Sequence, residues 1–126
     1  MEKVAMTYII DDDKIFVYVL KKVMEKNIKF KEIKEFRNGE EVLELITNDT
    51  NLPTVILLDI NMPIIDGWQF LDEVEKLNHK NKINIFIMSS SIDQREIEKS
   101  KMYSTVRDFI SKPINNEKLE KILEYI

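Results

Sequence analysis

Residues 55–67 contain the feature that most limits what this chain can fold into. Four apolar residues end abruptly at Asp59, and a Met-Pro pair and an Asp-Gly pair follow within eight positions. The run is too short for a helix and too uniform for a half-exposed strand, so it predicts a strand buried on both faces, as in a parallel sheet. Ligands of open α/β sheets bind beyond the carboxyl ends of the strands. Asp59 is therefore a candidate for chemistry, although this stretch alone is also compatible with a solvated turn residue.

Apolar runs and more polar segments divide the rest of the chain. The expected strands are residues 5–10, 31–37, 55–58, 83–88 and 105–110. The runs that end at Ile10, Leu58 and Met88 are strongly apolar, whereas the other two are more polar. Residues 31–37 are the weakest prediction, because they fit either an edge strand or an irregular segment.

Between these segments, apolar residues recur every three or four positions, which predicts amphipathic helices. The expected buried faces are Phe16, Val19, Leu20 and Val23; Val42, Leu43 and Ile46; Phe70, Leu71, Val74 and Leu77; Ile97 and Met102; and Leu119, Ile122, Leu123 and Ile126. Asp13, Asn38 and Asp66 are expected to be N-caps. With only two apolar anchors, the helix over residues 93–102 is expected to pack loosely.

Five repeats of strand and helix predict a parallel sheet with helices on both faces. Interior strands are covered on both sides, so the three apolar strands belong inside the sheet and the two polar ones at its edges. With right-handed crossovers this favours strand order 2-1-3-4-5, a flavodoxin-like (βα)5 three-layer sandwich.

The composition restricts the class of protein. A chain of 126 residues suits one domain over residues 1–126. It has no cysteine, which excludes a thiolate nucleophile and a zinc ribbon and fits a reducing cytoplasm. Its net charge of −4 argues against direct nucleic-acid binding. The first residues do not form a signal peptide, and no apolar run approaches the ~20 residues of a membrane span, so we expect a cytoplasmic protein without membrane contact.

The predicted strand order brings polar residues from four strand ends to one rim of the sheet. They are Asp11, Asp12, Asp59, Ser89 and Lys112. Three carboxylates at close range repel one another, so at least one pKa should rise unless a cation is present. Oxygen ligands of this kind suit Mg²⁺ or Mn²⁺, and a lysine provides a point charge for phosphate. Together these groups are suited to stabilising a phosphoryl group in transfer.

Over essentially all 126 residues, the chain resembles a response-regulator receiver domain of two-component signalling, of the single-domain chemotaxis-regulator type. The matching pieces are Asp11-Asp12, Asp59 to Pro63, Asp66-Gly67, Ser89, Phe109 and Lys112-Pro113. Each piece alone is weak evidence, but all of them in order, at strand ends, form a specific pattern.

The resemblance implies a role for each acid. Asp59 would be the phosphoacceptor and would take a phosphoryl group from the phosphohistidine of a sensor histidine kinase or a phosphotransfer protein. Asp12, Asp59 and the backbone carbonyl of Asn61 would bind Mg²⁺ or Mn²⁺ directly, and Asp11 would act through water.

The resemblance also implies how the signal leaves. Lys112 would pair with the phosphoryl group, Ser89 would bond one of its oxygens, and Phe109 would be the aromatic switch residue. The signal would pass to a downstream protein through the face formed by residues 93–126. Such a domain is not an enzyme with an external substrate, since it catalyses only its own phosphorylation and dephosphorylation. Ser89 stands where Thr is commoner, and Phe109 replaces a frequent Tyr, so a switch there must work by packing.

Two other functions compete with this interpretation. A hydrolase of the haloacid-dehalogenase type also uses an Asp nucleophile with Mg²⁺, but it needs a second acid where this chain has Asn61. A flavin-binding module of the same fold needs a loop rich in hydroxyl groups and Gly where this chain has Asp11, Asp12 and Asp13. Within the receiver interpretation, the sequence leaves open a stand-alone regulator, a relay intermediate or a truncated piece of a longer protein.

Overall fold

The computed structural model describes residues 4–62, 65–91 and 93–126. Within them, five parallel strands form one sheet in the order β2-β1-β3-β4-β5. The strands are β1 (Val4–Ile10), β2 (Phe30–Phe36), β3 (Val55–Asp59), β4 (Asn84–Ser89) and β5 (Val106–Ser111). The helices are α1 (Lys14–Glu25), α2 (Gly39–Ile46), α3 (Gly67–Glu75), α4 (Gln94–Ser100) and α5 (Asn116–Glu124), with a short 3-10 helix, η1 (Lys80–Lys82).

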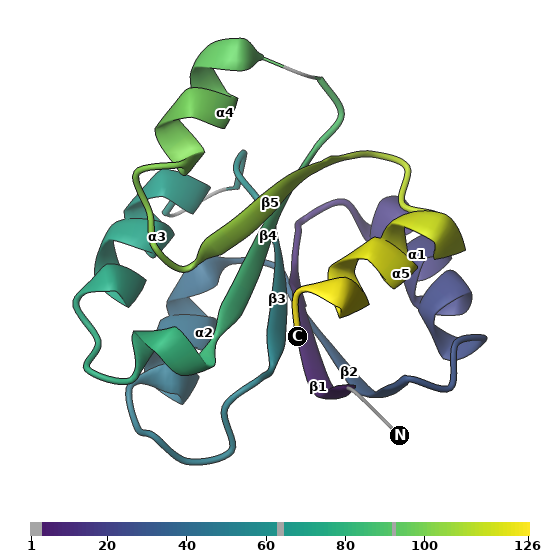
Figure 1. The fold of residues 1–126 in the computed structure, drawn as a ribbon, viewed down its shortest axis with the longest axis horizontal. Coiled ribbons are helices and arrows are strands. Elements are labelled where there is room, and N and C mark those ends of the chain that lie inside the picture. The colour runs from purple at the N-terminus through teal and green to yellow at the C-terminus, as the bar shows by residue number, and fades with distance from the viewer. Residues whose placement is uncertain (1–3, 63–64, 92) are drawn as a thin grey trace.

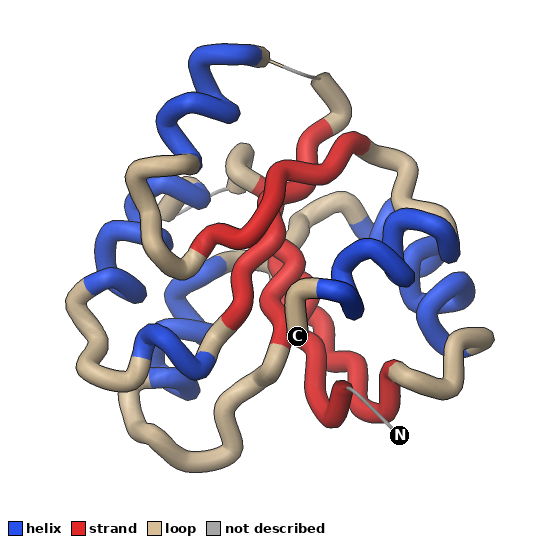
Figure 2. Tube along the Cα trace, viewed as in Figure 1, coloured by secondary structure: helices blue, strands red, loops and turns tan. Residues whose placement is uncertain are grey.

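Helices cover both faces of the sheet, so the molecule has three layers (Figure 2). Helices α1 and α5 lie on one face, and α2, α3 and α4 lie on the other (Figure 1). This confirms the predicted flavodoxin-like sandwich and its strand order. None of the helices in the described part of the chain is long and apolar enough to cross a membrane.

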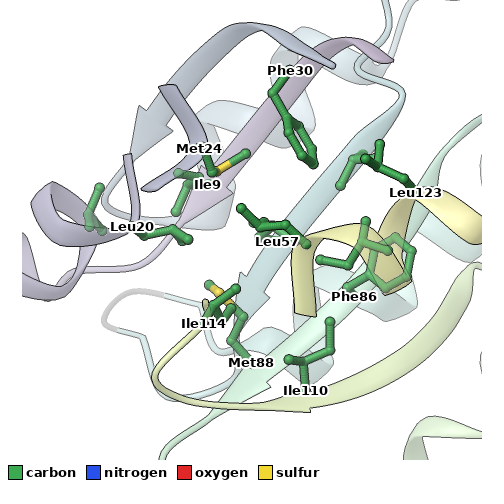
Figure 3. Close-up of a cluster of buried hydrophobic side chains, with 14 residues drawn as sticks. Ile9, Leu20, Met24, Phe30, Leu57, Phe86, Met88, Ile110, Ile114 and Leu123 are labelled. Carbon is green, nitrogen blue, oxygen red and sulfur yellow. The ribbon is translucent and has the colours of Figure 1, made fainter. Parts of the chain in front are cut away.

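Strand β3 lies in the middle of the sheet, between β1 and β4, and all five of its residues are buried. Its side chains alternate between the two faces of the sheet. Val55 and Leu57 point into the core beneath α1 and α5, which Figure 3 shows in close-up, whereas Ile56 and Leu58 point into the core beneath α2 and α3. Burial on both faces thus explains why the first four residues of this strand, Val55 to Leu58, are all apolar.

The uncertain segment at residues 31–37 is an edge strand, β2, which pairs with β1 alone. Between its end residues Phe30 and Phe36 it carries two lysines and two glutamates, and most of these positions are exposed. Charged side chains on an edge strand discourage pairing with a further strand.

Three expected helix contacts are wrong. On α1 the buried residues are Val17, Leu20 and Met24, while Val19 is 52% exposed. This helix has apolar residues all round, so its sequence contains two overlapping apolar stripes, and only contact with the sheet selects one. Met102 is 81% exposed because α4 ends before it, and Ile126 is also exposed at the chain end.

The predicted N-caps are confirmed. Asp13 accepts a hydrogen bond from the backbone N–H of Phe16, and Asn38 accepts from the second and third residues of α2. Asp66 forms a reciprocal capping box with Gln69. Each cap satisfies backbone N–H groups at a helix start that have no partner within the helix.

Glu75, at the end of α3, holds the turn between α4 and β5. Its carboxylate accepts hydrogen bonds from Thr105 N at 3.1 Å, Thr105 Oγ1 at 2.9 Å, Ser104 Oγ at 2.9 Å and Lys80 Nζ at 3.1 Å. Burial by itself would raise the pKa of Glu75, but these donors outweigh it and hold the pKa at about 2. Glu75 therefore joins the connection between α3 and β4 to the turn between α4 and β5 at the amino-terminal end of the sheet.

Glu75→Gln should lower the free energy of unfolding at pH 7 by about 1–3 kcal/mol, because charge-assisted hydrogen bonds are lost. The same stability should be present in the parent above about pH 4.5 and should be lost as the pH falls towards the folded-state pKa of about 2. Urea unfolding measures this, and hydrogen exchange at the Thr105 amide locates it. Glu73→Gln is the matched control, since Glu73 pairs with Lys76 on the exposed surface, where solvent screens the ion pair, and should leave the stability nearly unchanged.

Candidate functional site

Asp59 is the last residue of β3 and lies at the carboxyl end of the sheet. It is only 8% exposed, and its Oδ1 accepts a 3.4 Å hydrogen bond from the backbone N–H of Asn61. The following loop turns back so closely that a Cβ on Gly67 would lie 2.7 Å from the Cα of Ile60. A glycine is therefore required there for α3 to begin against the end of β3.

Asp11 and Asp12 follow β1, the neighbour of β3, and face Asp59. Asp11 is buried and Asp12 is exposed. Asp11 is held in place because its Oδ1 accepts the backbone N–H of Asp13 at 2.9 Å. One carboxylate oxygen from each of Asp11, Asp12 and Asp59 lies within 4.8 Å of the others. The predicted cluster of acids at the rim is thus present.

Lys112 brings a positive charge to the same point from the end of β5. Its backbone N–H donates to the Ser89 carbonyl at 2.8 Å, and the bond between Lys112 and Pro113 is a cis peptide. Its ammonium lies 2.8 Å from Asp11 Oδ2 and 3.9 Å from Asp59 Oδ1. The side chain is only 14% exposed, so these ion pairs are little weakened by solvent.

The charges around Asp59 are unevenly balanced. Burial is the largest effect and raises the pKa of Asp59, and the negative charge of Asp11 raises it further. Lys112 and the Asn61 N–H oppose this, yet the pKa reaches about 6. The raised pKa agrees in direction with the expectation for the cluster, but burial contributes more to it than the repulsion on which the expectation was based. A cation among these oxygens would remove the repulsion, so the donor set fits a hard divalent ion.

Ser89 and Phe109 make their contacts with groups outside this cluster. Ser89 ends β4, and its hydroxyl donates to the Ser91 carbonyl at 2.6 Å and accepts the Ser91 N–H at 3.2 Å. Phe109, on β5, is partly buried and packs against the core beneath α2 and α3. The structure therefore brings together Asp11, Asp12, Asp59 and Lys112, whereas Ser89 and Phe109 would have to turn to take part. Pro63 and Ile64, which belong to the Met-Pro stretch of the motif, lie outside the described residues.

One neighbour of the cluster was assigned only to the core by the sequence. The ring centroid of Phe16 lies 4.2 Å from the Lys112 ammonium. The sequence does contain a signal for a position near the site, because Phe16 lies in the first turn of the helix that begins directly after the rim acids Asp11 and Asp12 and the cap Asp13. The strand that carries Lys112, however, is distant in the sequence.

Comparison with known proteins identifies the family to which the chain is similar. A family model for the response regulator receiver domain matches residues 7–124. The chemotaxis protein CheY of Listeria monocytogenes is 28% identical over 116 residues, which are 92% of this chain and 93% of that protein. Other curated relatives are longer, and the chain spans 45% of the length of a response regulatory protein of Staphylococcus epidermidis.

Two solved structures show the same fold. A two-component response regulator from Cytophaga hutchinsonii matches with a TM-score of 0.90 and 26% identity, over 98% of this chain and 97% of that one. The receiver domain of the sensor histidine kinase PA1611 from Pseudomonas aeruginosa matches with a TM-score of 0.79 and 16% identity, over 95% and 94%. That domain was solved with a magnesium ion coordinated in its active-site cleft.

Without divalent cations, the stability of the protein should fall as the pH rises from about 4 to above 6. The unfolded chain releases the Asp59 proton near pH 4, whereas the folded protein keeps it until about pH 6, so the folded state binds more protons between these values. Asp59→Asn should remove this slope and raise stability at pH 7 by roughly 2–3 kcal/mol at most. Urea unfolding across the pH range, in EDTA, compares the two proteins. An unchanged slope in Asp59→Asn would show that another group causes it.

Proposed function

The chain belongs to the response regulator receiver domain family of two-component signalling, and from this membership we propose that Asp59 is the residue that accepts the phosphoryl group. The observation that carries the proposal is the convergence of Asp59, Asp11, Asp12 and Lys112 at the carboxyl end of the sheet. Neither competing function has this support, since Asn61 stands where the hydrolases need an acid and Asp11 to Asp13 stand where a flavin loop needs hydroxyl groups.

Asp59 would act as a nucleophile. One carboxylate oxygen attacks the phosphorus of a phosphohistidine, the P–N bond breaks, and its electron pair stays on the imidazole nitrogen. The product is an acyl phosphate on Asp59. With a pKa of about 6, the Asp59 carboxyl is mostly ionised at neutral pH and can attack. For dephosphorylation, water attacks the phosphorus, the acyl P–O bond breaks, and the carboxylate and inorganic phosphate are released.

Lys112 would stabilise the group in transfer. Its ammonium already lies 3.9 Å from Asp59 Oδ1, at the edge of the place where phosphoryl oxygens would be. A buried cation at this distance from developing negative charge is worth far more than one in water.

Receiver domains bind Mg²⁺ at an acidic site, and we propose that this chain binds Mg²⁺ or Mn²⁺ there. Asp12, Asp59 and the backbone carbonyl of Asn61 would be direct ligands, and Asp11 would act through water. The bound ion would neutralise the carboxylates and the phosphoryl oxygens during transfer. The three carboxylate oxygens within 4.8 Å of one another support this assignment.

The proposal includes the setting in which the domain works. Residues 1–126 would form one domain that takes phosphoryl groups from a sensor histidine kinase or a phosphotransfer protein and catalyses only its own modification. A cytoplasmic location is part of the proposal, because a chain without cysteine suits a reducing compartment. The partner that receives the signal would be a protein, since a net charge of −4 does not favour nucleic acid.

The output would begin at Ser89. To reach a phosphoryl oxygen on Asp59, its hydroxyl must leave the Ser91 carbonyl, and this would draw the loop after β4 inward. Helix α4 is able to follow, because Ser100 is its only buried residue among those described. Phe109 would turn into the vacated space, and the surface made by α4, β5 and α5 would change for a downstream protein.

The single tryptophan of the chain is placed to report such a movement. Trp68, on α3, stacks on Tyr103 with 5.9 Å between ring centroids, and the Lys99 ammonium of α4 lies 4.5 Å from the Trp68 ring. Tyr103 is also held by a 2.8 Å hydrogen bond to Asp72. A shift of α4 against α3 would alter the surroundings of the Trp68 indole.

Acetyl phosphate with Mg²⁺ should add one phosphoryl group to the parent protein, and Asp59→Asn should not be modified. Lys112→Ala should react about a hundredfold or more slowly, because a charge that stabilises the transition state is lost. Intact-mass spectrometry over time measures both, and EDTA should abolish the reaction. Asp49→Asn is the control, since Asp49 pairs with Lys82 on the exposed surface. Equal modification of Asp59→Asn and the parent would reject Asp59 as the acceptor.

Beryllofluoride, a phosphoryl mimic, should change Trp68 fluorescence and the amide shifts of α4, β5 and α5, and leave those of α2 nearly unchanged. Burying the Phe109 ring contributes at most about 1.5–3 kcal/mol, so the active form should already be sampled in the free protein. Ser89→Ala should still be phosphorylated but should show a much smaller response. Parent-like responses in both Ser89→Ala and Phe109→Ala would mean that the signal leaves by another route.

A further inference from the structure

The Lys112 ammonium has one neutral partner at the site. Among the described residues, it is in contact with Asp11 Oδ2 at 2.8 Å, Asp59 Oδ1 at 3.9 Å and the centroid of the Phe16 ring at 4.2 Å. Both carboxylates have separate roles in the proposed reaction: Asp59 forms a bond to phosphorus, and Asp11 helps to hold a cation. The ring is the one of these three contacts that neither a metal ion nor a phosphoryl group would use as a ligand or acceptor.

We propose that Phe16 is a positioning residue for phosphoryl transfer, whose ring face holds the Lys112 ammonium against Asp59 through a cation–π contact. This inference rests on the proposed role of Asp59 as phosphoacceptor. Phe16 acts through Lys112 and needs no contact with the donor.

The fold keeps the Phe16 ring in place from two sides. The backbone N–H of Phe16 donates to Asp13 Oδ1 at 3.0 Å, and the backbone N–H of Asp13 donates to Asp11 Oδ1 at 2.9 Å. The loop that sets Asp11 therefore also sets the first turn of α1. The ring packs from behind against the core beneath α1 and α5. The same hydrogen-bonded loop thus positions both Asp11 and Phe16, which contact the Lys112 ammonium.

The surroundings favour an electrostatic contribution from the ring. The Lys112 side chain is only 14% exposed, and a cation–π contact strengthens when the cation is removed from water. A lysine has a long, flexible stem, so its ammonium needs fixed partners if it is to stay in one place. Once a divalent ion competes for the carboxylates, the ring still attracts the ammonium. A leucine would fill the space and would not do so.

The test replaces the ring electrostatics while keeping its shape. Phe16 is replaced in turn by 4-fluoro-, 3,5-difluoro- and 3,4,5-trifluorophenylalanine, which weaken the negative ring face stepwise, and by leucine. Phosphorylation by acetyl phosphate at saturating Mg²⁺ is followed by intact mass, because a small donor avoids effects on protein docking. The rate constant should fall with each fluorine and be about two- to thirty-fold lower in Phe16→Leu, the range expected for losing a partly desolvated cation–π contact.

A second readout is spectroscopic. In the parent protein, ring current from Phe16 should move the Lys112 ε-methylene protons upfield in NMR spectra, and this shift should vanish in Phe16→Leu. Tyr18→Leu is the matched control. Tyr18 lies on the same helix, with the Lys22 ammonium 5.4 Å from its ring, but it is exposed and does not touch Lys112. This variant should react at the parent rate.

The outcomes separate the inference from the proposed function. Failure of the parent protein to be phosphorylated at Asp59 would overturn both. Phosphorylation of the parent with equal rates across the fluorinated series would overturn the role of Phe16 alone, even if Phe16→Leu were slower, because packing would then explain the loss. A graded fall in rate, together with loss of the Lys112 shift in Phe16→Leu and a parent-like Tyr18→Leu, is the result that supports it.

Discussion

The repulsion between three carboxylates at one end of the sheet is the constraint on which the rest of the structure depends. The single positive charge of Lys112 does not remove this repulsion. Its ammonium lies 2.8 Å from Asp11 but 3.9 Å from Asp59, so Asp59 is neutralised less than Asp11. Burial of Asp59 is the largest cause of the raised pKa of this carboxyl, about 6, and the negative charge of Asp11 raises it further. A fold optimised for stability alone would not place these charges together, and the proposed divalent ion would neutralise them.

The two ends of the sheet differ in how firmly side-chain hydrogen bonds hold the segments around α4. At the amino-terminal end, Glu75 binds the turn before β5, and Tyr103 is tied to α3 through Asp72. At the carboxyl end, the Ser89 hydroxyl bonds only within its own loop, and α4 is held by few buried groups. An input at Asp59 therefore meets a movable loop first. The amino-terminal end of α4 is expected to move furthest, while its carboxyl end rotates enough to change the contact between Lys99 and Trp68.

Most of the fold could be predicted from the sequence because its signals are local. Apolar runs ending at Asp11, Asp59 and Ser89 indicated strands, and their relative polarity indicated the strand order. The exposure of Val19 could not be predicted in this way, because a helix with apolar residues all round does not reveal which stripe meets the sheet. The exposure of Met102 could not be predicted because α4 ends at Ser100, before the expected helix boundary.

Site prediction had the same limit. The rim residues follow from strand ends alone, whereas the Ser89 hydroxyl bond and the Phe16–Lys112 contact depend on rotamers and on how α1 sits beside β5.

A proton, a divalent ion and a phosphoryl group can each bind at the carboxylates at the end of the sheet. Only the phosphoryl group can carry the proposed signal. A proton on Asp59 or a cation between the acids relieves repulsion without offering Ser89 a new partner. The phosphoryl group adds acceptor oxygens beyond the end of β3, which is where a hydroxyl leaving the Ser91 carbonyl would need them. Charge relief therefore sets the stability of the site, whereas hydrogen bonding to the new oxygens sets its conformation. A bound metal should stabilise the domain and prepare it for transfer without switching its output face.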